Sequence, residues 1–146
     1  MDQSNLPEGC SAERIELLKK RISGWVRQSR YRSRKTNVIV DVTFPEVVEI
    51  YEQERYSCVY CGKIADSPDH PFPIAEHGPC VPANIVPCCN ECRDKKGNRN
   101  IVKLYRDHII PEAKLHEILK TMLRRKGGED LRSYIKSIYI PKDTTI

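Results

Sequence analysis

Two Cys-x-x-Cys pairs constrain this chain more than any other feature of its sequence. Cys58 and Cys61 form the first pair, Cys89 and Cys92 form the second, and 27 residues separate them. Two such pairs supply the four thiolates of a tetrahedral structural zinc site, with each sulfur about 2.3 Å from the metal. The alternative is a set of reduced thiols buried in a core. We expect zinc, because a chain of 146 residues with two Phe and one Trp has a modest apolar core. Zinc binding adds on the order of 10 kcal/mol to the folding energy of such small domains.

The remaining cysteines leave one question of ligand identity open. The chain has seven cysteines, and an odd number argues against a closed set of disulfides. Cys88 and Cys89 are adjacent. Cys89 gives the usual spacer of two residues before Cys92, whereas Cys88 would give three, so we favour Cys89 as the ligand. Cys10 and Cys80 are expected not to bind metal.

The ends and the hydropathy of the chain predict a cytoplasmic protein with no membrane partner. Residues 1–5 lack the basic start and the apolar stretch of a signal peptide. No apolar run approaches the length of a transmembrane helix. In a reducing compartment, paired cysteines are more often metal ligands than disulfides.

Apolar periodicity and capping residues predict helices on both sides of the cysteine pairs. Ser11 is a good N-cap for a helix to about Gln28, and residues 30–37 read as a basic connector. Thr43 and Glu46 form a capping box that starts a helix to about Arg55. Further helices are expected from Cys89–Asn90 to about Gly97, from Pro111 to a stop at Gly127–Gly128, and over residues 131–138.

Between the cysteine pairs we expect a short β-hairpin. Its first strand ends at Asp69-His70, and its second strand is Asn84-Ile85-Val86. The expected organisation is an N-terminal helix and basic arm (1–42), a central domain (43–110) and a C-terminal helical extension (111–146).

Basic residues are concentrated near the N-terminus. The formal net charge is +5, and nine basic residues stand against Glu16 alone between Arg14 and Lys35. Such a cluster favours contact with phosphates. The alternative is an ordinary solvated helix face followed by a linker. Arg30, Arg32, Arg34 and Lys35 are the candidates in this arm, and Lys96 and Arg99 after the last cysteine could also reach phosphates, unless they form only an exposed helix end.

The central segment, about residues 56–100, resembles the HNH endonucleases, the zinc-containing branch of the ββα-metal nucleases. The resemblance consists of Cys58-x-x-Cys61-Gly62, Asp69-His70-x-x-Pro73, Gly78, Asn84-Ile85-Val86-Pro87, Cys89-x-x-Cys92 and Lys96-Gly97. The step of fourteen residues from His70 to Asn84 is also common in that family. The resemblance implies an α+β fold with a ββα-metal (HNH) core, stapled by a four-cysteine zinc site and flanked by N- and C-terminal helices.

The resemblance also implies roles for three residues between the cysteine pairs. His70 matches the family's general base, which takes a proton from the water that attacks phosphorus. Asp69 matches the carboxylate that ligates a catalytic Mg²⁺ or Mn²⁺. Asn84 matches the amide that braces the hairpin and orients the histidine. Without the resemblance, Asp69 and His70 would read as a turn aspartate and a surface histidine, and Asn84 as a turn or strand-edge amide. The implied activity is hydrolysis of phosphodiester bonds in DNA.

One position departs from the family pattern. Many members place Asn or His directly after the last cysteine as a second ligand to the catalytic metal, and here that residue is Arg93, which cannot bind a metal. Three explanations stay open. Asp94 or Asn98 completes the site, Arg93 contacts the scissile phosphate, or the domain has lost cleavage and is a zinc-stabilised module that binds nucleic acid or a protein. The sequence leaves open whether DNA is bound by a monomer, by a homodimer or by a larger defence or mobile-element complex.

Overall fold

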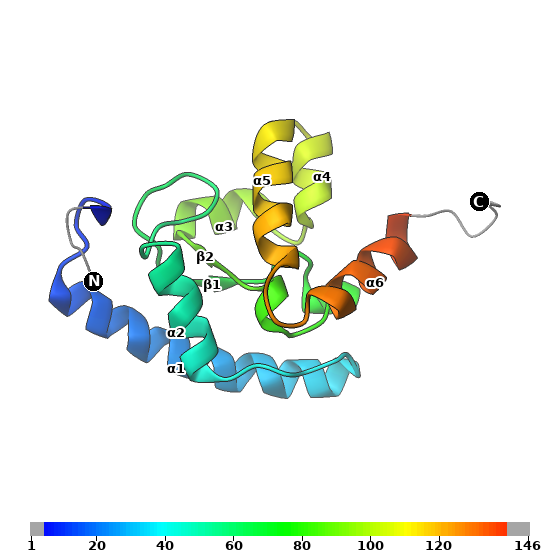
Figure 1. Ribbon diagram of the computed structural model, residues 1–146, viewed down its shortest axis with the longest axis horizontal. Coiled ribbons are helices and arrows are strands. Elements are labelled where there is room, and N and C mark those ends of the chain that lie inside the picture. Colours follow the sequence, from blue (N-terminus) through cyan, green and yellow to red (C-terminus); the bar gives the residue numbers. More distant parts are fainter. Residues whose placement is uncertain (1–4, 140–146) are drawn as a thin grey trace.

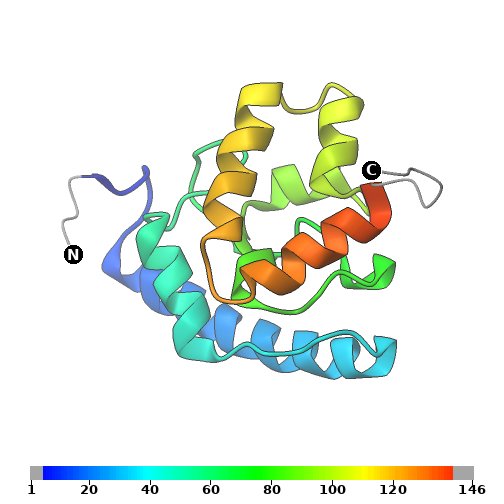
Figure 2. The same cartoon turned by 45° about the vertical axis from the view of Figure 1, so that its right-hand side comes forward.

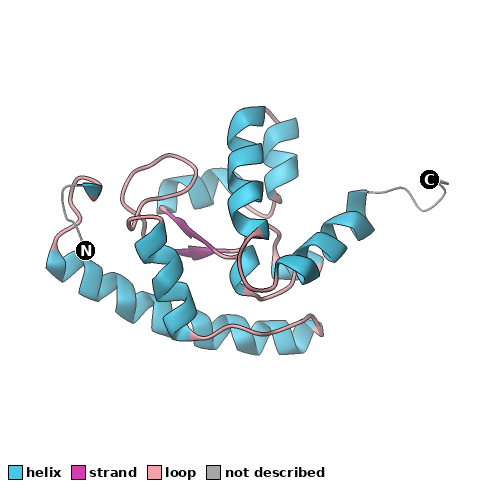
Figure 3. Cartoon of the chain, in the orientation of Figure 1, coloured by secondary structure: helices cyan, strands magenta, loops and turns pink. Residues whose placement is uncertain are grey.

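The computed structural model describes residues 5–139. Its elements, in chain order, are α1 (Ala12–Thr36), α2 (Phe44–Gln53), β1 (Ser67–Asp69), the 3-10 turns η2 (Ile74–Glu76) and η3 (Pro82–Asn84), β2 (Val86–Cys88), α3 (Asn90–Lys96), α4 (Ile101–Arg106), α5 (Glu112–Leu123) and α6 (Gly128–Tyr139). The described chain is therefore mixed α and β, mostly helical, with a small two-stranded sheet (Figures 1 and 3). The first four residues of the predicted segment 1–42 and the last seven of 111–146 lie outside the described residues.

Helix α1 begins where the sequence predicts and ends later. The Ser11 hydroxyl accepts a hydrogen bond from the Arg14 amide at 3.1 Å, as an N-cap should. The predicted end near Gln28 and the connector over 30–37 are wrong, because the helix continues to Thr36. Ser29 and Ser33 are buried and extend the stripe that runs from Ile15 to Val26, so small polar residues continue the packed face where the apolar pattern stops.

The capping box of α2 is confirmed. The Thr43 amide donates to the Glu46 carboxylate at 2.9 Å, and the Glu46 amide donates to the Thr43 hydroxyl at 3.4 Å. The helix ends at Gln53, slightly before the predicted Arg55. Arg55 and Tyr56 both have positive φ angles, of 55° and 58°, and this left-handed turn ends the helix before the first cysteine pair.

The predicted hairpin is present, with its second strand displaced along the chain. Strands β1 and β2 are antiparallel, and Asp69 is paired with Val86. The prediction that the second strand spans 84–86 is wrong for Asn84, which lies in η3, and for Ile85, which follows that turn, because β2 begins at Val86. Pro82 starts that 3-10 turn, and the Asn84 side chain is then used inside the loop instead of along a strand.

The C-terminal half contains one helix that the sequence did not predict. Helix α3 begins and ends as expected, and α4 is additional, with Asn100 as its N-cap. The predicted stop at Gly127–Gly128 is wrong, because α5 ends at Leu123 and Gly128 begins α6. Gly127 has φ 85°, and a Cβ there would lie 2.5 Å from the Val81 Cβ. Glycine is therefore required by close packing against Val81, not by a helix stop.

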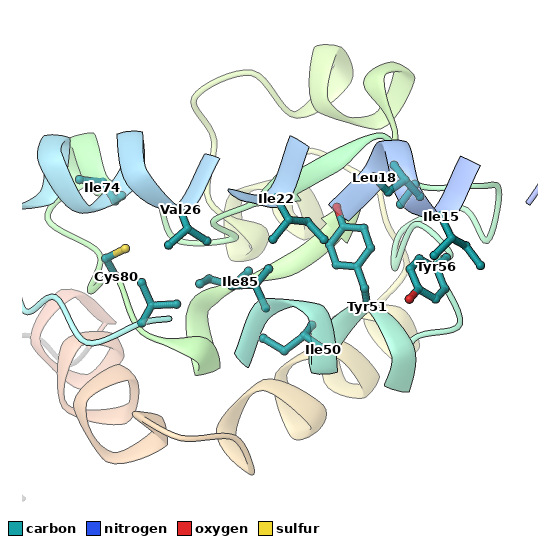
Figure 4. Packing of buried hydrophobic residues seen from close by; sticks show 13 residues of the cluster. Ile15, Leu18, Ile22, Val26, Ile50, Tyr51, Tyr56, Ile74, Cys80 and Ile85 are labelled. Carbon is teal, nitrogen blue, oxygen red and sulfur yellow. The ribbon is translucent and has the colours of Figure 1, made fainter. Parts of the chain in front are cut away.

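Two hydrophobic clusters lie on either side of the hairpin. In the first, Ile15, Leu18, Ile22 and Val26 of α1 point toward α2 and Ile85 (Figure 4). In the second, α4 and α5 lie side by side and α6 packs against α5 and η3 (Figure 2). Phe72 and Val86 belong to this second cluster, so residues just after β1 and within β2 are fixed by the C-terminal helices. Within residues 5–139, no helix combines the length and apolar character that crossing a bilayer requires.

Candidate functional site

The four paired cysteines come together in one group. Their sulfur atoms all lie within 4.8 Å of one another, and the Cys61 and Cys89 sulfurs are 3.6 Å apart. Four sulfurs at about 2.3 Å from a tetrahedral metal would be about 3.8 Å apart. The group can therefore hold a structural metal such as zinc. Its membership also confirms Cys89, and not Cys88, as the partner of Cys92.

Local backbone structure positions each cysteine pair. In the first pair, the Gly62 amide donates to the Cys58 carbonyl at 2.9 Å, and the positive φ of Gly62 (81°) closes the turn. In the second pair, Cys89 is the N-cap of α3, and its sulfur accepts a hydrogen bond from the Cys92 amide at 3.4 Å. The hairpin and α3 thus bring together residues that are 28 positions apart.

Cys88 packs against this group and changes the pKa of one of its cysteines. It is buried, and its sulfur lies 3.3 Å from the Cys89 carbonyl oxygen. Hydrogen bonding by the Cys88 thiol lowers the pKa of Cys58 to about 4, and the same interaction raises the pKa of Cys88. The arrangement favours a thiolate at Cys58, which is the form that binds a metal.

Asp69 ends β1 with its carboxylate turned toward α3. The Lys96 ammonium lies 3.5 Å from it, and the Tyr60 hydroxyl donates to it at 3.3 Å. Lys96 is only 3% exposed, although its ammonium is charged. A buried lysine needs a counter-charge, so Asp69 and Lys96 fix the end of α3 over the end of β1.

His70 follows Asp69 and is almost enclosed. Its ring is 7% exposed and stacks on the Trp25 indole, with ring centres 4.7 Å apart and planes at 28°. Its Nε2 atom is buried and has no hydrogen-bond partner within residues 5–139. Burial, followed by the charges of Arg32 and Lys96, lowers the pKa of His70 to about 3. The imidazole is therefore neutral at pH 7.

Asn84 binds backbone on both sides of its amide. Its oxygen accepts from the Phe72 amide at 3.0 Å, and its nitrogen donates to the carbonyls of Phe72 and Pro79 at 2.8 and 2.9 Å. Asn84 is fully buried. It fixes the backbone two residues after His70, so any influence on the imidazole is transmitted through the chain and not through a hydrogen bond to the ring.

A cleft of about 580 Å³ opens beside Asp69 and His70, and we call it the site cleft. Trp25 and Arg32 contribute its α1 wall, and residues 93, 94 and 96–98 contribute another wall. Three basic side chains line it, together with the acids Asp69 and Asp94. The Arg93 guanidinium donates to the Pro68 carbonyl at 2.8 Å and so lies along the edge of β1. The cations are Arg32, Arg93 and Lys96.

The predicted nucleic-acid contacts are divided by the fold. Arg32, Arg93 and Lys96 line the site cleft, and Arg99 lines a neighbouring groove. The other basic-arm residues line neither, because α1 is helical here and turns successive residues in different directions. Lys35, for example, lies over the Tyr31 ring at 4.8 Å. The residues outside both hollows are Arg30, Arg34 and Lys35.

Sequence reasoning missed two residues that contact the Asp69-His70 pair. Tyr60 lies inside the first cysteine pair, and no pattern pointed to its hydroxyl. Trp25 occurs among the apolar residues of α1, and no pattern pointed to a contact with His70. A signal was available, because Trp25 and Arg32 are seven residues apart and share one face of a continuous helix.

Oxygen donors for a hard cation are also present at the site cleft. The carboxylates of Asp69 and Asp94 and the amide of Asn98 line it. Mg²⁺ is usually held by one or two carboxylates together with substrate phosphates, so this donor set fits by type. Among residues 5–139, the cysteines are the only compact group of three or more His, Cys, Asp or Glu side chains.

Comparison with known proteins adds no relative. No protein-family model matches the chain, and a search of curated proteins found no match.

Proposed function

We propose that this chain is a metal-dependent HNH-type endonuclease that hydrolyses phosphodiester bonds in DNA. The observation that carries the proposal is the position of Asp69 and His70 at one cleft with three basic side chains, next to the four-cysteine group. In this interpretation β1, β2 and α3 form the ββα-metal core, and zinc at the cysteines holds it together.

The cations of the site cleft would bind the phosphate that is cut. Arg32 reaches the cleft from α1, and Arg93 reaches it from α3. A guanidinium binds phosphate oxygens through two parallel hydrogen bonds, which gives both attraction and orientation. Under this proposal Arg93 is a phosphate contact instead of the metal ligand that the family pattern has there.

His70 would act as the general base. Its neutral imidazole can accept a proton from a water molecule, whose oxygen then attacks phosphorus. A pKa of about 3 makes the free protein a weak base. A bound phosphate would offset the positive charges of Arg32 and Lys96, and so raise the pKa of His70 when substrate is present.

Asp69, with Asp94 or Asn98, would hold the catalytic divalent cation. When bound, Mg²⁺ or Mn²⁺ would stabilise the charge that develops on the phosphate and on the departing 3′ oxygen. In the free chain the Asp69 carboxylate pairs with Lys96, so binding of the cation would require Lys96 to give up part of this ion pair. Asn84 would keep the loop after His70 in register with η3, as its three backbone hydrogen bonds do in the free chain.

A plasmid assay tests the proposal. Zinc-loaded protein should nick or cut supercoiled DNA with Mg²⁺ or Mn²⁺, and His70→Ala should abolish cutting while zinc content stays unchanged. His116→Ala is a matched control, because His116 lies exposed on α5 and, within residues 5–139, pairs only with Glu112. Equal cutting by wild type and His70→Ala would exclude the mechanism.

A second candidate is a module that binds nucleic acid or a protein without cutting. The Asp69–Lys96 ion pair favours it, because a lysine already occupies the carboxylate that a cation needs. Arg93 favours it too, since it stands where many HNH endonucleases have a ligand to the catalytic metal. This candidate predicts salt-dependent DNA binding with no turnover in any metal. Cutting gained by Arg93→Asn would show that only a ligand was missing.

A further inference from the structure

A second hollow continues from the site cleft, and we call it the distal groove. It has a volume of about 720 Å³ and lies between the segment from α3 to α4 and the end of α6. The two hollows share residues 94 and 96–98 in their walls. The distal groove therefore extends the site cleft beyond the region that resembles the HNH family.

The distal groove is predominantly basic. Five basic and two acidic side chains line it; they are Lys95, Lys96, Arg99, Lys103 and Arg106, with Glu76 and Asp94. Lys103 and Arg106 are three residues apart and lie on one face of α4, and Arg99, which precedes the helix, shares the Asp107 carboxylate with Lys103. A row of cations on one face matches a row of phosphates better than a single anion.

Acidic neighbours leave this row with excess positive charge. Asp107 accepts from Arg99 at 3.2 Å and from Lys103 at 2.9 Å, so one carboxylate serves two cations. Arg106 is exposed and lies over the Tyr139 ring at 5.3 Å. No carboxylate pairs with Arg106 among the residues that the structure describes. Arg106 is therefore the cation of the groove that is most available to a ligand.

We propose that the distal groove binds the phosphodiester backbone of the DNA whose scissile phosphate lies in the site cleft. The inference rests on the proposed function and adds a binding segment formed by α4 and α6. Helix α4 has six residues and rises about 9 Å. One DNA strand places a charge about every 3.4 Å along the axis, so the basic row can contact more than one phosphate.

The test measures binding separately from cutting. A short fluorescein-labelled DNA duplex is titrated by anisotropy at about 50 to 200 mM salt, without divalent cations. The variants are Arg106→Gln and Lys103→Gln/Arg106→Gln. The matched control is Arg132→Gln, because Arg132 is exposed on α6 and lines neither hollow. Circular dichroism and zinc content verify that each variant folds.

Each lost phosphate contact should weaken binding about five- to tenfold near 0.1 M salt and reduce the salt slope by about 0.9. Arg132→Gln should change neither quantity. Wild-type affinity and slope in the double variant would overturn the proposal. Equal affinity of the wild-type chain for polyglutamate and for the duplex would also overturn it, because the groove would then be a docking surface for acidic protein.

The nuclease proposal can fail separately. Cutting that persists in His70→Ala removes the catalytic assignment, whereas the binding loss in Lys103→Gln/Arg106→Gln still supports the groove. Conversely, normal binding by that double variant removes the groove and leaves His70-dependent cutting intact.

Discussion

The cysteine group and the site cleft lie next to each other but are built in different ways. The cysteine group needs only two short turns, one closed by Gly62 and one capping α3. The site cleft needs side chains from helices far apart in the chain, with Trp25 from α1 over His70 and Lys96 from α3 against Asp69. Metal binding is therefore a local property of the hairpin and α3, whereas the environment of His70 depends on α1. The site cleft can therefore be disrupted without loss of the metal site.

The largest effect is expected from removing a metal ligand. Cys89→Ser should abolish stoichiometric zinc binding and cooperative unfolding, because structural zinc contributes on the order of 10 kcal/mol to such domains. Zinc by mass spectrometry and thermal unfolding measure the two consequences. Cys10→Ser is the control, since Cys10 lies outside the group. A folded, zinc-containing Cys89→Ser protein would mean that Cys88 can replace Cys89.

The next largest effect should come from Asn84, whose buried side-chain amide binds the backbone of Phe72 and Pro79. Asn84→Ala removes three hydrogen bonds and leaves backbone groups of Phe72 and Pro79 without these partners. Each unsatisfied buried group costs about 1–3 kcal/mol, so the free energy of unfolding should fall by about 3 kcal/mol or more. Denaturant unfolding measures this loss, and zinc content should be unchanged. Simultaneous loss of zinc would show that the two regions are not independent.

The pH dependence of stability tests the burial of His70. Its folded pKa, about 3, is below the ordinary value of about 6.5, so the unfolded chain binds more protons between these values. This contribution to stability is present above pH 6.5 and is lost as the pH falls toward 3. The slope approaches about 1.4 kcal/mol per pH unit between the two pKa values. His70→Gln should reduce the slope of unfolding free energy against pH by that amount. Equal slopes in the wild type and in His70→Gln would contradict the burial of a neutral imidazole.

The smallest effect is expected in a comparison of DNA binding by variants of Arg32 and Arg30, two arginines of the predicted basic arm. Arg32 lines the site cleft and Arg30 does not. Arg32→Gln should weaken duplex binding about five- to tenfold near 0.1 M salt, as expected for one lost phosphate contact. Arg30→Gln should have little effect. Anisotropy titrations of both variants make the comparison, and equal losses would mean that the whole arm binds DNA without a preferred face.

Local patterns predicted local features of this molecule well. The Ser11 cap, the Thr43–Glu46 box, the start of α3 and the choice of Cys89 all depend on residues a few positions apart, and each is confirmed. The continuation of α1 was missed because Ser29 and Ser33 are buried by tertiary packing, which no apolar pattern reveals.

The candidate site was predictable in its residues but not in its surroundings. Asp69, His70 and Asn84 stand out by type and spacing. The stacking of Trp25 on His70 and the Lys96–Asp69 pair depend on how α1 and α3 pack against the hairpin. The distal groove needed α4, which begins at Ile101 after an Asn cap and, with six residues, is too short to show a helical period.

Trp25 is the only tryptophan of the chain, and it lies against His70. Its intrinsic fluorescence therefore comes from one wall of the site cleft. An anion entering there, or a proton taken up by the imidazole, would alter the emission of this indole. The wild-type chain thus carries its own optical probe for events at His70, and no label has to be attached.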